Sequence, residues 1–282
     1  MILLTKESLP KVIVPRKAKS HKGSYGRVVC IGGIRQYGGA IIMCAQACVK
    51  SGAGLVTVVT DVATIPALHS RLPEAMALSF QDQEALQNVL ATADVIVIGP
   101  GLGVEKEAFQ LLKLVLQQQT KDQWLVIDGS AITLLADHPV DFLFPEHLVL
   151  TPHQKEWERF SGLALKEQTI RANWHAQKKL GITLVLKSEQ THIYTNHEQY
   201  QNTFGNPAMA TGGMGDTLAG IIGGFLGQFG HTDLQAEAAI CAAVTIHSFI
   251  ADELAKDAYV VLPTEIANHL PQTMRKFCPF AR

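Results

Sequence analysis

The most reactive grouping in the 282-residue chain is a glycine-rich turn that ends in an acid. It runs from Gly205 to Asp216 with the sequence GNPAMATGGMGD and leads into a long apolar stretch typical of a helix. The backbone N–H groups of Gly212, Gly213, Met214 and Gly215 can converge on one anion there, an anion hole reinforced by the helix dipole. A carboxylate beside such a hole suits a base that takes the proton of a hydroxyl attacking a phosphate, which makes Asp216 the candidate catalytic residue. The alternative is an Asp216 that only caps the helix.

The two most familiar phosphate-binding motifs are absent from the sequence. Neither G-x-x-x-x-G-K-[ST] nor G-x-G-x-x-G occurs, so phosphate must be held by another device. The run Gly99 to Gly103 (GPGLG) is dense enough in glycine to suggest a backbone pressed against a ligand, although a tight turn at Pro100 is the alternative. Lys187 could contact a phosphate or simply end a strand, and His153 could contact a ligand or simply cap a helix.

These segments need a scaffold, and the hydrophobic pattern predicts one. Apolar runs without alternation predict buried strands at 27–31, 55–60, 94–98, 124–128, 147–151 and 182–187. Helical patterns lie between or after them at 39–50, 83–93, 104–119, 154–161 and 170–180, followed by a hairpin at 192–204 and helices at 217–229, 234–254 and 264–276. The alternation predicts a three-layer α/β fold with a mostly parallel central sheet and helices on both faces. With no repeat or linker visible, residues 1–282 are expected to form a single domain.

In an open parallel sheet, ligands bind beyond the carboxyl ends of the strands. Ligand contacts are therefore expected in the segments that follow the predicted strands. They are Gly32 to Ala40, Gly99 to Gly103, Asp128 to Ser130, Thr151 to His153, Lys187 to Thr191, and the turn from Gly205 to Asp216.

Composition and charge exclude several classes of partner. Lys plus Arg number 24 and Asp plus Glu 25, a formal net charge of -1 without a basic block, so neither nucleic acid nor an anionic membrane is an expected partner. Uncharged runs such as 217–232 fall short of the roughly 18 apolar residues of a membrane span, and no secretory signal is visible. A cytoplasmic location is expected. The 17% of charged residues is low, which favours burial of some surface in an oligomer.

The five cysteines do not form a recognisable framework. Their number is odd and no CxxC pair occurs, which argues against disulfides and against a zinc site. Cys44 and Cys48 lie one helical turn apart in an apolar stretch and are predicted to be small core residues. No metal ligand set is expected from the protein.

Taken in order, these motifs resemble the ADP- or ATP-dependent NAD(P)H-hydrate dehydratases, a family of the ribokinase-like superfamily. The resemblance runs from about residue 20 to about residue 255. It rests on Gly32-Gly33 with Gly38-Gly39-Ala40, SGAGLV at 51–56, VIGPGLG at 97–103, LTPH at 150–153, VLK at 185–187 and, most specifically, GNPAMATGGMGD at 205–216. Many ribokinase-like kinases share only the final Gly-x-Gly-Asp.

The resemblance implies a ribokinase-like fold and the repair of hydrated NADH and NADPH, at the S epimer, with phosphate cleaved from ADP or ATP. It implies that Asp216 activates the substrate hydroxyl, that Ala40, Gly103, His153 and Asp216 contact the hydrate, and that Mg²⁺ bridges the nucleotide phosphates. The implied contacts with the adenine nucleotide are Lys187, Ser188, Glu189, Gln190, Thr191 and Gly215. A homotetramer is also implied. An epimerase domain is not visible in this sequence, so the other epimer is expected to depend on a separate NAD(P)H-hydrate epimerase or on spontaneous epimerisation.

Two positions depart from the family pattern, which usually has a second Asp where this chain has Ser130 and Thr where it has Met214. Two other functions stay open. A ribokinase-like kinase of a small alcohol or vitamin precursor would use Asp216 in the same way but leave the phosphate on its product. A non-catalytic nucleotide-binding module would not need Asp216 as a base.

Overall fold

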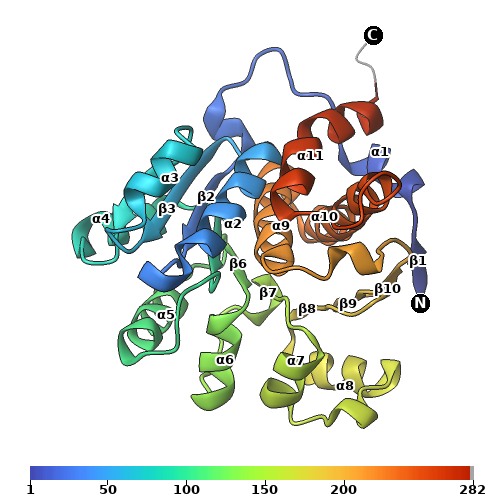
Figure 1. Ribbon diagram of the computed structural model, residues 1–282. Helices are drawn as coiled ribbons and strands as arrows, with labels where there is room; N and C mark the ends of the chain where they lie inside the picture. The colour runs from blue at the N-terminus through green and yellow to red at the C-terminus, as the bar shows by residue number, and fades with distance from the viewer. Residues whose placement is uncertain (280–282) are drawn as a thin grey trace.

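The computed structural model describes residues 1–279, in which ten strands form one sheet covered by helices on both faces (Figure 1). The strand order is β1-β10-β9-β8-β7-β6-β5-β2-β3-β4. The strands are β1 (Ile2–Leu4), β2 (Arg27–Ile31), β3 (Leu55–Thr60), β4 (Met76–Ser79), β5 (Val95–Ile98), β6 (Trp124–Ile127), β7 (Leu148–Leu150), β8 (Thr183–Leu186), β9 (His192–Tyr194) and β10 (Gln199–Asn202). Only β9 is antiparallel to its two neighbours, so the sheet is mostly parallel, as predicted.

The helices follow the strands in the expected alternation and then accumulate at the C-terminal end. They are α1 (Leu9–Val12), α2 (Gly38–Lys50), α3 (Ile65–Arg71), α4 (Gln83–Thr92), α5 (Lys106–Gln118), α6 (Ser130–Asp137), α7 (Gln154–Ser161), α8 (Ile170–Leu180), α9 (Met214–Phe229), α10 (Asp233–Leu254) and α11 (Pro263–Phe277). Both clusters of buried apolar side chains lie against this one sheet. The three-layer α/β prediction is confirmed.

Each central strand is buried on both faces, which explains its lack of alternation. In β2, Val28 and Cys30 belong to the apolar cluster on one face of the sheet, which includes residues of α2, α9, α10 and α11. Val29 and Ile31 belong to the cluster on the other face, which includes residues of α4, α5, α6 and α7. Successive strand residues point to opposite faces, so a strand between two helical layers must be apolar throughout.

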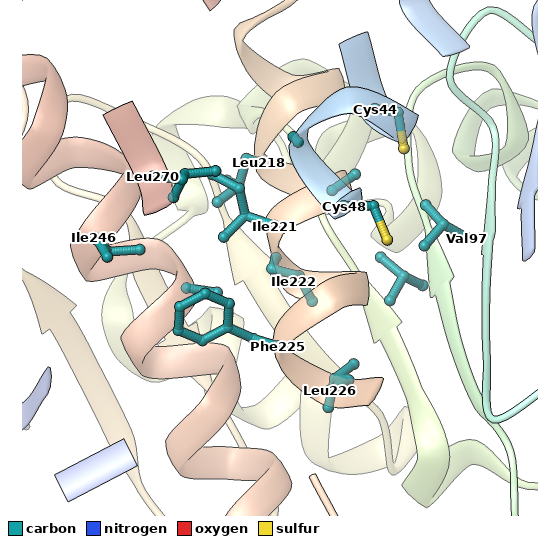
Figure 2. Packing of buried hydrophobic residues seen from close by; sticks show 14 of the residues in the cluster. Cys44, Cys48, Val97, Leu218, Ile221, Ile222, Phe225, Leu226, Ile246 and Leu270 are labelled. Carbon is teal, nitrogen blue, oxygen red and sulfur yellow. The ribbon is translucent and has the colours of Figure 1, made fainter. Parts of the chain in front are cut away.

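Helix α9, which carries the glycine-rich turn at its start, lies at the centre of one layer. Figure 2 shows Leu218, Ile222 and Phe225 on this helix between α2 and α10. The close approach of α2 depends on Gly220, where a Cβ atom would lie 2.1 Å from the carbonyl oxygen of Cys44. Because α9 is enclosed on nearly all sides, its first turn is held firmly at the edge of the sheet.

Two predictions concern the cysteines and the longest apolar helix. Cys44 and Cys48 are fully buried core residues with free thiols, as predicted, and all five cysteines are free. Burial raises the pKa of the Cys48 thiol and keeps it neutral. Among residues 1–279, α10 alone is long and apolar enough to cross a membrane by length and composition. The prediction from uncharged runs did not include this helix, because it contains charged residues. In its most apolar window 72% of the residues are buried inside the protein, as in a core helix.

Five elements of the structure were not predicted from the sequence: β1, α1, α3, β4 and α6. Strand β1 pairs with β10 at the sheet edge, and exposed Ile2 and Leu3 leave it without a burial pattern. The predicted start of α9 was also three residues late, because Gly215 and Asp216, in its first turn, have low helix propensity.

Candidate active site

The carboxyl ends of three adjacent strands bring together a buried ion pair. Asp128 follows β6 and Lys187 follows β8, while Thr151 follows β7 between them. Lys187 Nζ lies 2.8 Å from Asp128 Oδ1, and Thr151 Oγ1 donates a hydrogen bond to the same oxygen at 2.7 Å. The Asp128 side chain is only 3% exposed, so its charge depends on these partners.

Lys187 remains charged in this setting. Burial alone would lower its pKa, but the carboxylates of Asp128, Glu156 and Asp216 together raise the pKa above its ordinary value. A permanently cationic side chain therefore stands at the end of β8. The structure places it beside the glycine-rich turn, where it can attract an anion.

Asp216 is the third residue of α9 and is not the helix cap. The N-cap is Gly213, whose φ of 97° suits a glycine, and the Asp216 carboxylate makes no capping hydrogen bond. The interpretation of Asp216 as a mere cap is therefore wrong. Burial, followed by the negative charge of Asp128, raises the pKa of Asp216 to about 6, while Lys187 opposes the shift.

The expected anion hole has the geometry of a free helix N-terminus. The N–H group of Thr217 bonds to the Gly213 carbonyl, so the N–H groups of Met214, Gly215 and Asp216 precede the first intrahelical bond. A Cβ atom on Gly215 would lie 3.0 Å from Lys187 Nζ and 3.7 Å from Asp128 Oδ2. The first turn of α9 thus lies close to the Lys187 ammonium, and the absence of a side chain on Gly215 permits this approach. Among residues 1–279, no atom lies within 4 Å of the position that a Cβ on Gly212 would take, which leaves this side of the turn open.

A cavity of about 450 Å³ begins at this point and extends toward α10. Five of the six residues expected to contact a nucleotide line it: Lys187, Ser188, Glu189, Thr191 and Gly215. Gln190 does not line it, because its side chain is exposed and bonds to Gln201. The opposite wall is the loop from Gly205 to Ala210, which Asp252 of α10 holds through Gly205 N at 3.1 Å and Asn206 Nδ2 at 2.7 Å.

His153 caps α7, as the simpler interpretation predicted. Its Nδ1 accepts the N–H groups of Lys155 at 3.1 Å and Glu156 at 3.2 Å, while Glu156 Oε2 accepts the His153 N–H at 2.8 Å. His153 also forms an isolated parallel bridge with Lys187, so the cap stands next to the ion pair. Its side chain is 55% exposed and remains available to a ligand.

Ala40 and Gly103 lie on the other side of Asp128, beyond β2 and β5. Ala40 is in the first turn of α2, and its Cβ lies 3.1 Å from the position of a Cβ on Gly101. The glycines of 99–103 are explained by packing within the protein: a Cβ on Gly99, where φ is 125°, would lie 1.7 Å from the Asp128 carbonyl oxygen. Ala40, Gly103 and His153 do not line the 450 Å³ cavity, but they share its edge of the sheet.

Sequence reasoning assigned no role to three residues that shape this site: Asp128, Glu156 and His247. Asp128 had a signal in the sequence, since it and Lys187 are opposite charges at the ends of two strands that are separated in the sheet only by β7. Glu156 follows His153 at the capping-box spacing. His247 lies in the middle of an apolar helix pattern and lines the cavity from α10, a position that only the fold reveals.

Comparison with known proteins agrees with this arrangement. The family model for NAD(P)H-hydrate dehydratase matches residues 28–272. The chain is 54% identical over 277 residues to the ADP-dependent (S)-NAD(P)H-hydrate dehydratase of Enterococcus faecalis, covering 98% of this chain and 94% of the relative. A crystal structure of a ribokinase-like superfamily protein from Enterococcus faecalis has a TM-score of 0.96 at 54% identity, covering 99% of this chain and 96% of that one. The ADP/ATP-dependent NAD(P)H-hydrate dehydratase from Bacillus subtilis, co-crystallised with ATP/Mg²⁺, has a TM-score of 0.82 at 28% identity, covering 97% of each chain.

Proposed function

The chain belongs to the NAD(P)H-hydrate dehydratase family, and on that premise we propose that it removes water from the S epimer of NADH hydrate and NADPH hydrate at the expense of ADP. The products are NADH or NADPH, AMP and phosphate. ADP is preferred to ATP in this proposal because relatives of 45–54% identity are named ADP-dependent. The reaction is a nucleotide-driven carbon–oxygen lyase reaction that repairs a damaged cofactor.

The chemistry explains why a kinase-like site serves a dehydration. Hydroxide is a poor leaving group, so direct loss of water from the reduced ring is slow at neutral pH. The ring hydroxyl instead attacks the terminal phosphorus of ADP, the bond from this phosphorus to the bridging oxygen breaks, and AMP departs. The ring nitrogen then expels phosphate, and loss of a proton from the neighbouring carbon restores the double bond.

The observation that carries this proposal is the position and pKa of Asp216. Its carboxylate stands in the first turn of α9 next to free N–H groups, with a pKa raised to about 6 by burial and by Asp128. A base with a pKa near the working pH takes a hydroxyl proton efficiently and is unprotonated in most molecules at pH 7. We propose that Asp216 takes this proton while the N–H groups of Met214 and Gly215 hold the transferring phosphoryl group.

We propose that the 450 Å³ cavity takes the adenine nucleotide with its phosphates at Lys187 and Gly215. Ala40, Gly103 and His153 would contact the hydrate, which enters from the strand ends beyond Asp128. This division would let the substrate hydroxyl, next to Asp216, and the AMP leaving group lie on opposite sides of the transferred phosphorus, as in-line transfer requires.

Mg²⁺ fits this site as a companion of the nucleotide. Within residues 1–279 no three His, Cys, Asp or Glu side chains form a metal cage, but Mg²⁺ commonly binds phosphates with only one or two protein carboxylates. Asp128 supplies such a group, since Oδ1 is engaged by Lys187 and Oδ2 faces Gly215. When bound, the ion would neutralise phosphate charge.

The proposal is tested by incubating the protein with prepared NADH hydrate, Mg²⁺ and either ADP or ATP, while recording phosphate release and recovery of the reduced-nicotinamide absorbance. We expect both signals to rise in equal amounts, faster with ADP. A kinase of the hydrate would leave a phosphorylated alcohol without recovery, and a binding module would give neither signal. Recovery without nucleotide would contradict the phosphorylation mechanism.

Adding one methyl group at Gly215 should damage nucleotide binding selectively. The Cβ of Gly215→Ala would stand 3.0 Å from Lys187 Nζ, in the space assigned to phosphate, whereas the residue's helical backbone tolerates alanine. We expect the KM for ADP to rise roughly 10- to 100-fold, consistent with the loss of one or two charge-assisted contacts. Initial rates at varied ADP measure it, with Gly39→Ala as the control, because a Cβ on Gly39 meets no atom of residues 1–279 within 4 Å and Gly39 does not line the cavity. An unchanged KM in Gly215→Ala would place the phosphates elsewhere.

The rate should rise with pH through the pKa of Asp216. Only the ionised carboxylate accepts the hydroxyl proton, and burial with the charge of Asp128 sets its pKa to about 6. We expect kcat/KM to fall about tenfold for each pH unit below 6 and to level off above 7. A pH profile with NADH hydrate and saturating ADP measures this. A flat profile between pH 5 and 7 would remove Asp216 as the base.

We further propose that the chain acts as a single domain in a cytoplasmic homo-oligomer, a tetramer by family resemblance, next to a separate epimerase that converts the other hydrate epimer. Exposed apolar side chains support self-association: Tyr37, Val62, Val104, Leu234 and Tyr259. Sedimentation of the purified protein tests the oligomer. An equal mixture of the two epimers tests the dependence on an epimerase. We expect the protein to dehydrate only half of this mixture, and the reaction to go to completion when an epimerase is added.

A further inference from the structure

One buried histidine of the nucleotide cavity has an unused nitrogen. His247 lies on α10, is 4% exposed, and lines the cavity with Lys187 and Gly215. Its Nε2 atom is buried and has no hydrogen-bond partner among the described residues. Buried polar atoms are nearly always paired, so an orphan in the wall of a cavity indicates that a ligand completes it.

The other ring nitrogen fixes what kind of ligand atom is needed. The ring bonds to the backbone of Met214. We assign this bond to Nδ1, because Nε2 is the ring nitrogen without a partner. Burial, followed by the charge of Lys187, lowers the pKa of His247 to about 4, so the ring is neutral at pH 7. A neutral imidazole that donates through Nδ1 to a carbonyl carries a lone pair on Nε2. The ligand atom must therefore be a hydrogen-bond donor.

Phosphate oxygens do not meet this requirement, but the nucleoside half of ADP does. Its donors are the exocyclic amino group of adenine and the two ribose hydroxyls. The neighbouring polar group on α10, Ser248 Oγ, already accepts the Asn202 Nδ2 hydrogen at 2.9 Å. Nε2 of His247 is therefore the side-chain acceptor on this wall that has no partner among the described residues.

We propose that Nε2 of His247 accepts a hydrogen bond from the adenine amino group or a ribose hydroxyl of the bound nucleotide, which makes His247 a specificity-determining residue. This inference rests on the proposed nucleotide-dependent function. It orients the nucleotide with its nucleoside toward α10 and its phosphates toward Lys187.

The test measures nucleotide affinity directly by calorimetry, with no need for turnover. The wild-type protein is titrated with ADP and with three analogues that each lack one donor: 2′-deoxy-ADP, 3′-deoxy-ADP and inosine diphosphate. One analogue should bind about tenfold more weakly than ADP, the usual effect of leaving one buried acceptor unpaired. That analogue identifies the donor. Equal affinities for ADP and all three analogues overturn the proposal without any variant.

Two variants separate the Nε2 contact from the structural role of the ring. His247→Asn keeps a donor near the position of Nδ1 for Met214 but has nothing at Nε2, whereas the Oε1 atom of His247→Gln can replace the Nε2 acceptor. We expect His247→Asn to bind ADP about tenfold more weakly than the wild type and to bind ADP and the weak analogue with equal affinity. We expect His247→Gln to recover most of the ADP affinity and most of the discrimination between ADP and that analogue.

Ile246→Val is the matched control, since Ile246 is buried on the same helix and does not line the cavity. Its affinities should equal those of the wild type. Unchanged ADP affinity or unchanged discrimination in His247→Asn overturns the proposal for His247 alone. Absence of ADP binding to the wild type would instead overturn the proposed function, and the two failures are thereby distinguished.

Discussion

Replacing Asp216 by Asn should lower kcat by about 100- to 10,000-fold while leaving the Kd for ADP within about threefold of the wild-type value. The amide keeps the size of the side chain but cannot accept the hydroxyl proton. The N–H groups of Met214 and Gly215, which hold the phosphoryl group in the proposed site, belong to the backbone and stay in place. Steady-state kinetics with NADH hydrate give kcat, and calorimetry gives the Kd. A non-catalytic nucleotide-binding module would be indifferent to this change.

The same substitution should stabilise the folded protein at neutral pH. The folded pKa of Asp216 is raised from 3.8 to about 6, so folding takes up a proton between these values and the free energy of unfolding falls as pH rises across them. Above pH 6 the folded protein bears the full cost of the buried charge, which asparagine removes. We expect a gain of a few degrees in Tm at pH 8 and little change near pH 4. Asp257→Asn, at an exposed position, serves as the control and should alter neither activity nor Tm.

The second large effect is expected from Lys187→Met. It removes the cation that faces the first turn of α9, and kcat/KM should fall by about 100- to 1,000-fold. It also leaves Asp128, only 3% exposed, without its charged partner, which should cost about 3–5 kcal/mol of unfolding free energy. Urea unfolding and initial rates measure the two losses separately.

A double variant separates catalysis from stability. Asp128→Asn combined with Lys187→Met removes both buried charges, so most of the stability should return while the activity stays low. Lys155→Met, which removes an exposed lysine paired only with Glu158, is the matched control and should leave both quantities unchanged. Recovery of activity together with stability in the double variant would show that Lys187 has only a structural role.

The strands and helices with clear sequence patterns were predictable, and so was the location of the site at the ends of those strands. The predicted bounds of β2, β3, α7 and α8 match the structure, because buried apolar runs and helix caps determine them locally. The location of the site followed from the parallel sheet, since the strand ends collect Asp128, Thr151 and Lys187 at one edge.

What escaped prediction depends on contacts between distant segments. The pairing of Asp128 with Lys187 joins residues 59 positions apart. The cap of α9 lies at Gly213 instead of Asp216 because a glycine with φ of 97° starts the helix earlier than its apolar pattern does. His247 lines the cavity only because α10 packs beside the turn at Met214, and no residue spacing in the sequence predicts that contact.

The fate of one oxygen atom tests the central claim most directly, namely that Asp216 makes the substrate hydroxyl attack the nucleotide. NADH hydrate prepared in ¹⁸O-labelled water carries the label in its ring hydroxyl, and the phosphate released in unlabelled water with ADP and Mg²⁺ is analysed by mass spectrometry. If the hydroxyl attacks phosphorus, its oxygen leaves with the phosphate, and we expect one ¹⁸O atom in each phosphate formed. Unlabelled phosphate, with the ¹⁸O recovered in water, would show that the nucleotide is hydrolysed separately and would contradict the role given to Asp216.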